Sequence, residues 1–134
     1  NREQVIRMKI KAIDHLVITT ADLDTCLAFY VGILGMELDE SNHRYALRFG
    51  NSKFNIHTRK AEFLPAAQNP TYGSLDLCLV VDVPINEIVN EITSKKYPIE
   101  DGPVLRHGAQ GAMQSIYLRD FDGNLIEISS YNEI

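Results

Sequence analysis

The sequence of 134 residues has no tryptophan, only two cysteines and no long apolar run. Cys26 and Cys78 lie inside apolar stretches without CxxC spacing. This placement favours two small core residues in a reducing compartment over a disulfide framework or a zinc site. No stretch reaches the roughly 18 apolar residues of a membrane-spanning helix, and the N-terminus lacks an h-region and a cleavage site. We therefore expect a cytoplasmic protein with no membrane partner.

Positive charge is also scarce, because 13 Lys and Arg face 18 Asp and Glu, for a net charge of -5. No basic stripe is available for a phosphate backbone, so nucleic acid is not an expected partner, although an acidic protein can still carry a local cationic site. Glycine and proline number only eight and five, and 45% of the residues are hydrophobic. This composition predicts one ordered domain, which we place at residues 10–134.

The chain contains an internal repeat of a strand followed by a helix. In the first half, residues 13–20 alternate as a strand does, and apolar residues from Leu23 to Leu34 then recur at helical spacing. Thr20 or Asp22 can cap this helix and Gly35 can end it. In the second half, residues 76–81 alternate, and an apolar stripe at helical spacing follows Pro84. Repeats of this kind predict two similar modules.

Three further strand-like pieces follow each helix. They cover residues 37–40, 43–49 and 53–59 in the first half and 104–107, 113–119 and 125–131 in the second. We therefore predict an α+β fold of two βαβββ modules, module one at 10–60 and module two at 74–132. One module cannot bury both faces of its sheet. The two should pair, with helices outside and a curved mixed-sheet cleft between them.

Strand alternation places polar residues on the face of each sheet that the helices do not cover. This face carries His15, Asn55, His57, Arg59, Asp76, Glu127, Ser129 and Tyr131. Taken singly, such residues are usually hydrogen-bonded structural histidines or solvated carboxylates. The repeat, however, puts His15 and Asp76 at equivalent places in the two modules, and His with Asp or Glu is a usual ligand set for Zn, Fe, Ni or Mn. The pattern predicts a metal site in the cleft.

The segments IDHLVITTADLDTCLAFYVGILGMEL and IYLRDFDGNLIEISSY resemble signatures of the vicinal oxygen chelate superfamily of glyoxalases, bleomycin-resistance proteins and dioxygenases. LRFGNSKFNIHT, PTYGSLDLCLV and PIEDGPVLRHGAQG are similar to its subgroup called glyoxalase domain-containing protein 5. The resemblance runs from about Ile13 to Tyr131. It implies one divalent metal ion, held by residues of the first and last strands of the modules.

Carried over by position, the resemblance makes His15 and Glu127 ligands. Asp76 replaces the family's usual His or Gln, and the usual Glu of module one is replaced by Asn55 or, one pleat on, His57. A set of His15, His57, Asp76 and Glu127 would suit Ni, Zn, Mn or Fe(II). The alternative is that Asp76 is too short to reach the ion, which leaves a weakened or absent metal site.

Three functions are compatible with the resemblance. In a glyoxalase-like lyase or isomerase, the leading hypothesis, Glu127 removes a proton beside a carbonyl, and His57 or Asp76 returns it. In an extradiol dioxygenase acting on a catechol, His15, His57 and Glu127 would bind Fe(II), with His57 or Tyr131 as the acid or base. A small-molecule binding protein without turnover is the third possibility.

The remaining candidates are contacts to a small-molecule substrate: Asn55, Arg59, Tyr72, Arg106 and His107. Arg106 and His107 precede the Gly-rich GAQG, which is either a lid over an anionic substrate or an ordinary turn. Asp120 and Asp122 are expected to shape a hairpin through hydrogen bonds to its backbone. We expect a homodimer, with modules paired within one chain or exchanged between chains.

Overall fold

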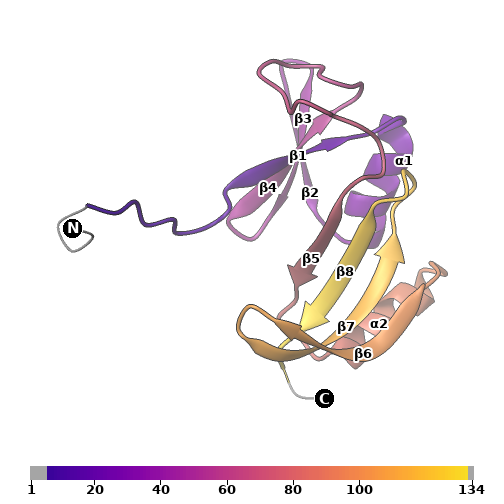
Figure 1. Ribbon diagram of the computed structural model, residues 1–134. Helices are drawn as coiled ribbons and strands as arrows, with labels where there is room; N and C mark the ends of the chain where they lie inside the picture. Colours follow the sequence, from indigo (N-terminus) through magenta and orange to yellow (C-terminus); the bar gives the residue numbers. More distant parts are fainter. Residues whose placement is uncertain (1–5, 133–134) are drawn as a thin grey trace.

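The computed structural model describes residues 6–132 and consists of two four-stranded sheets, one from each half of the chain (Figure 1). The strand orders are β1-β4-β3-β2 and β5-β8-β7-β6. In each sheet the first and last strands of the half pair in parallel, and the other pairs are antiparallel. The predicted α+β fold of two βαβββ modules is confirmed. The last two residues of the predicted domain lie outside the described residues.

Module one contains one helical segment and four strands. Its elements are β1 (His15–Thr19), α1 (Leu23–Leu27), η2 (Ala28–Ile33), β2 (Glu37–Ser41), β3 (Arg44–Phe49) and β4 (Ser52–His57). The predicted helix is present as α1, which continues directly into the π-helical turn η2. The Asp22 side chain caps it by accepting from two backbone N–H groups. Gly35 follows it with φ of +76°, a conformation that favours glycine.

Module two repeats the plan with a longer helix. Its elements are β5 (Asp76–Val80), α2 (Ile85–Ser94), β6 (Asp101–Gly108), β7 (Gly111–Arg119) and β8 (Leu125–Ser130). The apolar stripe of α2 faces the sheet, and Ile85 and Ile92 are buried. None of the helices in residues 6–132 has the length and apolar character needed to cross a membrane.

The two modules share one hydrophobic core. Buried side chains of both helical segments and both sheets belong to a single cluster, which includes Phe29 of η2 and Ile92 of α2. The Phe29 ring also packs against Tyr97, with centroids 5.3 Å apart. Lys95, at the end of α2, donates to the backbone oxygen of Ile33 at 2.8 Å. The helical sides of the two modules therefore meet inside the chain.

The turn between β7 and β8 ties the modules together. Tyr30 Oη donates to Asp120 Oδ2 at 2.6 Å in a buried contact, and Thr20 Oγ1 donates to Asp122 Oδ2 at 2.6 Å. Asp120 also accepts from the backbone N–H groups of Asp122 and Asn124 at 3.0 and 2.8 Å. The predicted hairpin-shaping role is confirmed for Asp120 and is wrong for Asp122, whose carboxylate instead accepts from Thr20 Oγ1 and the Ala21 backbone N–H. The turn has a second role, because both carboxylates bind residues of module one.

Candidate functional site

Each sheet has one open face, opposite the face that packs into the shared core. The parallel pairs fix which residues share it. On sheet one they are His15, Val17 and Thr19 beside Lys53, Asn55 and His57; on sheet two they are Asp76, Cys78 and Val80 beside Leu125, Glu127 and Ser129. Val17 and Val80 are 41% and 60% exposed, so apolar side chains interrupt the polar ones on both faces.

The exposure and the hydrogen bonding of His15 are those expected of a histidine that binds a metal. Its side chain is 48% exposed, and its Nδ1 lies 2.8 Å from Oδ2 of Asp14. The hydrogen bond from His15 is the main cause that lowers the pKa of the Asp14 carboxyl. A carboxylate that accepts from Nδ1 orients the imidazole and leaves Nε2 available, which is the usual arrangement around metal-bound histidines.

Glu127 is oriented by a chain of small polar groups on sheet two. Ser129 Oγ donates to Glu127 Oε2 at 3.2 Å and lies 2.6 Å from Ser115 Oγ and 3.1 Å from Cys78 Sγ. Burial raises the pKa of the Cys78 thiol, and the charge of Glu127 raises it further. Cys78 therefore stays protonated near neutral pH. The half-buried Glu127 carboxylate therefore keeps oxygen lone pairs that can bind a ligand on the open face.

Strand register identifies the counterparts of the two modules. Glu127 pairs with Cys78 on β5, and in module one the corresponding pair is Asn55 with Val17. Asn55 thus stands where Glu127 stands in module two. His57 pairs with Thr19, four residues along the strand from the pair of His15 with Lys53. At about 3.3 Å per residue, this places His57 roughly 13 Å from His15 along the sheet.

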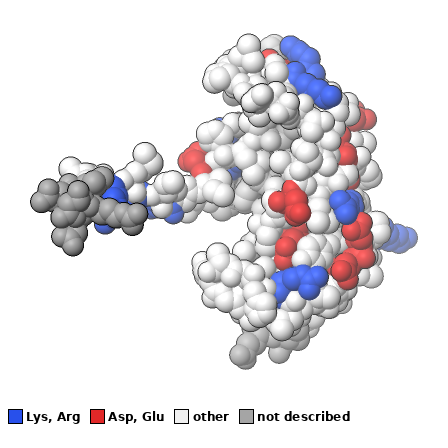
Figure 2. Space-filling model, viewed as in Figure 1, with Lys and Arg blue, Asp and Glu red and all other residues white. Residues whose placement is uncertain are grey.

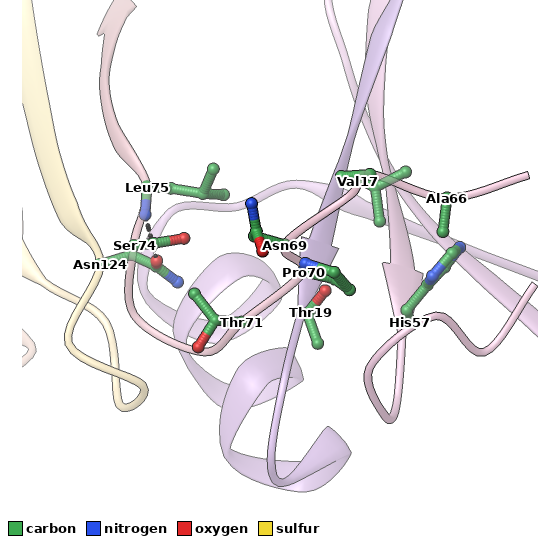
Figure 3. A pocket seen from close by; sticks show the side chains of 11 residues that line it. Val17, Thr19, His57, Ala66, Asn69, Pro70, Thr71, Ser74, Leu75 and Asn124 are labelled. Carbon is green, nitrogen blue, oxygen red and sulfur yellow. Dashed lines mark hydrogen bonds between the residues drawn. The ribbon is translucent and has the colours of Figure 1, made fainter.

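His57 lies beneath the connector between the modules rather than in the open. It is 7% exposed, and the Phe63 ring stands edge-on to it, with centroids 5.3 Å apart. A cavity of about 140 Å³ lies beside His57, with Val17 and Thr19 on its sheet side (Figure 3). Across from them the connector contributes Asn69 and Thr71 among other residues.

The other predicted site residues of module two lie on different faces of its sheet. Arg106 Nε donates to Tyr117 Oη at 2.8 Å, and Tyr117 pairs directly with Glu127, so Arg106 belongs to the open face. His107 follows Arg106 in β6, and strand alternation turns it to the opposite face. Tyr131 Oη accepts from the backbone N–H of Gln110 at 3.1 Å, which braces the β6–β7 hairpin away from Glu127.

Arg59 is predicted to lie on the fourth strand, but β4 ends at His57, so Arg59 lies beyond the sheet at the start of the connector, which also carries Tyr72. Arg59 pairs with Glu62 at 3.4 Å and has an exposed side chain. Tyr72 is 39% exposed, and Lys60 Nζ lies 5.3 Å from the centre of its ring.

The candidate metal ligands of a single chain do not lie together. In residues 6–132, no group of three or more His, Cys, Asp or Glu lies close enough to hold an ion. The donor types nevertheless fit a divalent metal, since His15 offers an imidazole and Asp76 and Glu127 offer carboxylates from neighbouring strands. His15 belongs to module one and the two carboxylates to module two, so a complete set needs the two open faces to meet.

Several residues of the open faces escaped the sequence interpretation. Tyr117 and Ser115 lie on β7 beside Glu127 and Ser129, and Asp14 supports His15. Period-two alternation assigns β7 residues to a face. It does not say which of them stand next to Glu127, because that depends on the β7–β8 register.

Comparison with known proteins identifies the family. The model of the Glyoxalase/Bleomycin resistance protein/Dioxygenase superfamily matches residues 12–128, and the chain belongs to this superfamily. The match spans both modules and includes His15 and Glu127.

The similar proteins carry varied names. The virulence protein STM3117 of Salmonella typhimurium is 49% identical over 127 residues, covering 94% of this chain and 88% of that protein. The glyoxalase domain-containing protein RDO1 of Mycosarcoma maydis is 41% identical over 133 residues, covering 98% of this chain and 75% of that protein. The crystal structure of STM3117 matches with a TM-score of 0.89 at 48% identity, covering 93% of this chain and 100% of the other. A lactoylglutathione lyase from Agrobacterium tumefaciens, at 20% identity and a TM-score of 0.72 over 92% of this chain and 96% of that one, shares the fold.

Proposed function

We propose that this protein is a metal-dependent, glyoxalase-like lyase or isomerase that acts on a small substrate with two neighbouring oxygens. The proposal rests on one observation, which is that hydrogen bonds orient two side chains that can bind a metal. Asp14 orients the imidazole of His15, and Ser129 orients the carboxylate of Glu127. Both donors stand on open sheet faces, and such supporting hydrogen bonds typically accompany metal ligands.

The proposed ligands are His15, Asp76 and Glu127, with Asn55 in the fourth position, because His57 stands too far along the sheet from His15 to share the ion. The register favours Asn55, because it is the module-one counterpart of Glu127. When bound, a divalent ion such as Ni, Zn, Mn or Fe(II) would act as a Lewis acid for the two substrate oxygens. The ligand types do not select among these metals.

We further propose that the site forms in a homodimer, where sheet one of one protomer faces sheet two of its partner. Within a chain the helical sides of the modules are already packed together, which leaves both open faces uncovered. Val17 and Val80 supply exposed apolar area on these faces. A two-fold dimer uses each face once and so creates two equivalent sites.

In this site Glu127 is the base that removes a proton from the carbon beside the carbonyl. Its side chain is held by Ser129, and the hydroxyl of its neighbour Tyr117 is fixed by Arg106. Asp76, which is more exposed than Glu127, stands on the adjacent strand and would receive this proton from Glu127 and deliver it to the neighbouring carbon, so that both carboxylates end as they began. His57 and Tyr131 stand farther along the sheets, as groups that contact the remainder of the substrate.

The second candidate is a binding protein without turnover. It is favoured by the exposure of Asp76, a short side chain that stands where the family usually has His or Gln. The catechol dioxygenase alternative needs His15 and His57 on one ion, and the roughly 13 Å between them along the sheet disfavours it.

The test is metal content by mass spectrometry on untagged protein prepared without chelators. We expect about one divalent ion per chain, lost in His15→Ala, Asp76→Ala and Glu127→Ala. Asp82→Ala, which removes an exposed carboxylate next to β5, is the control and should keep the ion. Metal-loaded protein is then assayed for isomerisation of methylglyoxal hemithioacetals. No bound ion, even after reconstitution with Ni, Mn, Zn or anaerobic Fe(II), would overturn the metal-dependent enzyme and favour the binding protein.

A further inference from the structure

A second cavity lies on the open face of sheet one; it includes Asn55, the proposed fourth ligand, and extends past it, away from the metal position. It has a volume of about 210 Å³. The β4 residues whose side chains share this open face line the cavity along its length; they are Lys53, Asn55 and His57. Arg44 of β3 and Phe63 of the connector also line it. The Lys53 end adjoins His15, because these two residues are direct partners across the β1–β4 pair.

The far end of this cavity is built around Arg44. Its guanidinium lies over the ring of Phe63, 4.0 Å from the ring centre, and that ring in turn stands edge-on to His57. Stacking uses the flat face of a guanidinium and leaves its N–H groups, which lie in the plane, free to bind. Two parallel N–H groups match the two oxygens of a carboxylate.

The position of Phe63 is itself fixed by the turn that carries it. The Glu62 carboxylate accepts from the backbone N–H of Thr58 at 2.7 Å and pairs with Arg59 at 3.4 Å. These bonds hold the start of the connector against the end of β4. The platform under Arg44 is therefore part of the fold.

The charges around the cavity favour an anion. Asp39 lines it too, but its carboxylate is paired with Arg48 at 2.9 Å. Across the part of the chain from 6 to 132, Arg44 and Lys53 have no carboxylate within ion-pair distance. Arg44 is therefore a cation without an ion-pair partner in the described part of a chain of net charge -5, whereas the charge of Lys53 is partly balanced by Asp14, whose pKa is lowered by the hydrogen bond from His15 and further by Lys53. On the face shown in Figure 2, by contrast, acidic and basic side chains lie side by side over the strands of sheet two.

We propose that this cavity binds a carboxylate of the substrate that is separate from the two neighbouring oxygens. The proposal rests on the proposed function and specifies its substrate class as a small molecule with vicinal oxygens at one end and a carboxylate at the other. Arg44 binds the carboxylate bidentately, and the chain between the two ends passes along the cavity toward the metal position. The roughly 13 Å of strand from Lys53 to His57 leaves room for such a molecule once the side chains are allowed for.

The experiment compares two five-carbon 2-oxo acids that differ only at the far end. These are 2-oxoglutarate, which has a second carboxylate at C5, and 2-oxopentanoate, which has a methyl group there and only the carboxylate at C1. Binding to the metal-free full chain is followed by NMR through the Arg44 Nε–Hε signal and the Asn55 side-chain amide. We expect 2-oxoglutarate to bind about tenfold more tightly, and to shift both signals.

Variants test whether the preference comes from Arg44. Arg44→Gln should remove it, and Arg44→Lys should retain only a small part, because a lysine cannot form the bidentate pair. Arg119→Lys, an exposed arginine paired with Glu100 on the other module, is the matched control and should keep the preference. Backbone NMR signals establish that each variant is folded.

Three results with the two acids would overturn the assignment. They are equal affinity for the two acids, a preference that survives Arg44→Gln, or no Arg44 shift at concentrations on the order of 10 mM. A larger Arg44 shift with inorganic phosphate than with 2-oxoglutarate would also overturn it, in favour of a tetrahedral anion. Since the NMR arm contains no metal, its outcome is independent of the metal-content test, and either proposal can fail alone.

Discussion

At the scale of single residues, the hydroxyl of Ser129 organises the open face of sheet two. A serine hydroxyl donates one hydrogen bond and accepts two. Ser129 contacts Glu127, Ser115 and Cys78, and an ionised Glu127 can only accept. The single proton of Ser129 is therefore used on Glu127, and Ser115 and Cys78 must both donate to Ser129.

This arrangement predicts the reactivity of Cys78. Burial and the Glu127 charge both raise the pKa of the thiol, so little thiolate exists at pH 7 to 8 and alkylation by iodoacetamide should be slow despite the exposed side chain. Glu127→Gln removes one cause of the rise. The pKa of the Cys78 thiol should fall, and alkylation at pH 7 to 8 should become faster because more thiolate is present.

The control for Cys78 is Glu100→Gln, which removes a distant exposed carboxylate and should leave the rate unchanged. Equal acceleration in both variants, or none in Glu127→Gln, would contradict the assigned coupling. Cys26 is an internal reference, since burial raises its pKa to about 12 and it should react more slowly than Cys78.

The sequence predicts part of this residue-scale picture. Alternation alone places His15, Asn55 and Glu127 on the faces that are open in the structure. It does not reveal the stacking of Arg44 on Phe63, because these residues belong to β3 and the connector and meet only through the path of the chain. The choice between Asn55 and His57 as counterpart of Glu127 likewise depends on strand register.

At the scale of elements, the repeated βαβββ plan could be predicted almost completely. Strand and helix periodicity, the Asp22 cap and Gly35 are local signals, and each element lies within a few residues of its predicted position. The irregular features were not predictable. η2 is π-helical, and β6 begins three residues before its predicted start, with a register shift between Asp101 and Val104.

Two glycines should respond oppositely to alanine. Gly102, within the shift, has φ of +96°, and a Cβ there would collide with the backbone oxygen of Ser115 and come within 2.9 Å of Ile116 Cα. Gly102→Ala should lower the free energy of unfolding by about 2–4 kcal/mol. Gly32 in η2 has open space around it, and Gly32→Ala should be neutral or stabilise by up to about 1 kcal/mol.

Chemical denaturation of both variants measures these differences. Similar effects of the two alanines would show that the β6 shift does not depend on the conformation of Gly102. A change in the slope with denaturant would instead indicate an altered native or unfolded state.

At the scale of the whole molecule, the carboxylates of the β7–β8 turn join the modules. Burial and the Asp120 charge raise the pKa of Tyr30, so its phenol stays protonated and donates. Tyr30→Phe should cost about 2 kcal/mol and lower the melting temperature by roughly 5–10 °C. Tyr45→Phe is the control, because the Tyr45 hydroxyl makes no hydrogen bond within the described chain. A drop of equal size in the control would contradict the assignment.

The proposed dimer makes a separate prediction. Val80→Lys places a charge on the open face of sheet two and should convert a particle of about twice the 15.1 kDa chain mass into a monomer. Leu105→Lys changes a similarly exposed residue, 56% against 60%, on the opposite face and should leave the mass unchanged. Sedimentation equilibrium distinguishes these outcomes, and a monomeric wild type would refute the dimer.

The patterns in the sequence do not specify how the two modules are arranged. The repeat predicts that two modules pair, but not whether the sheets meet inside one chain. That choice depends on long-range contacts such as Phe29 with Tyr97 and Tyr30 with Asp120, which pack the helical sides together.

The division of donors between the two modules has a genetic consequence. If each site takes His15 from one protomer and Glu127 from the other, a cell with one allele lacking His15 and another lacking Glu127 assembles mixed dimers. In each mixed dimer both lesions fall in the same site, and the second site is intact. Two inactive alleles should therefore complement each other, with up to about half the activity per mixed dimer.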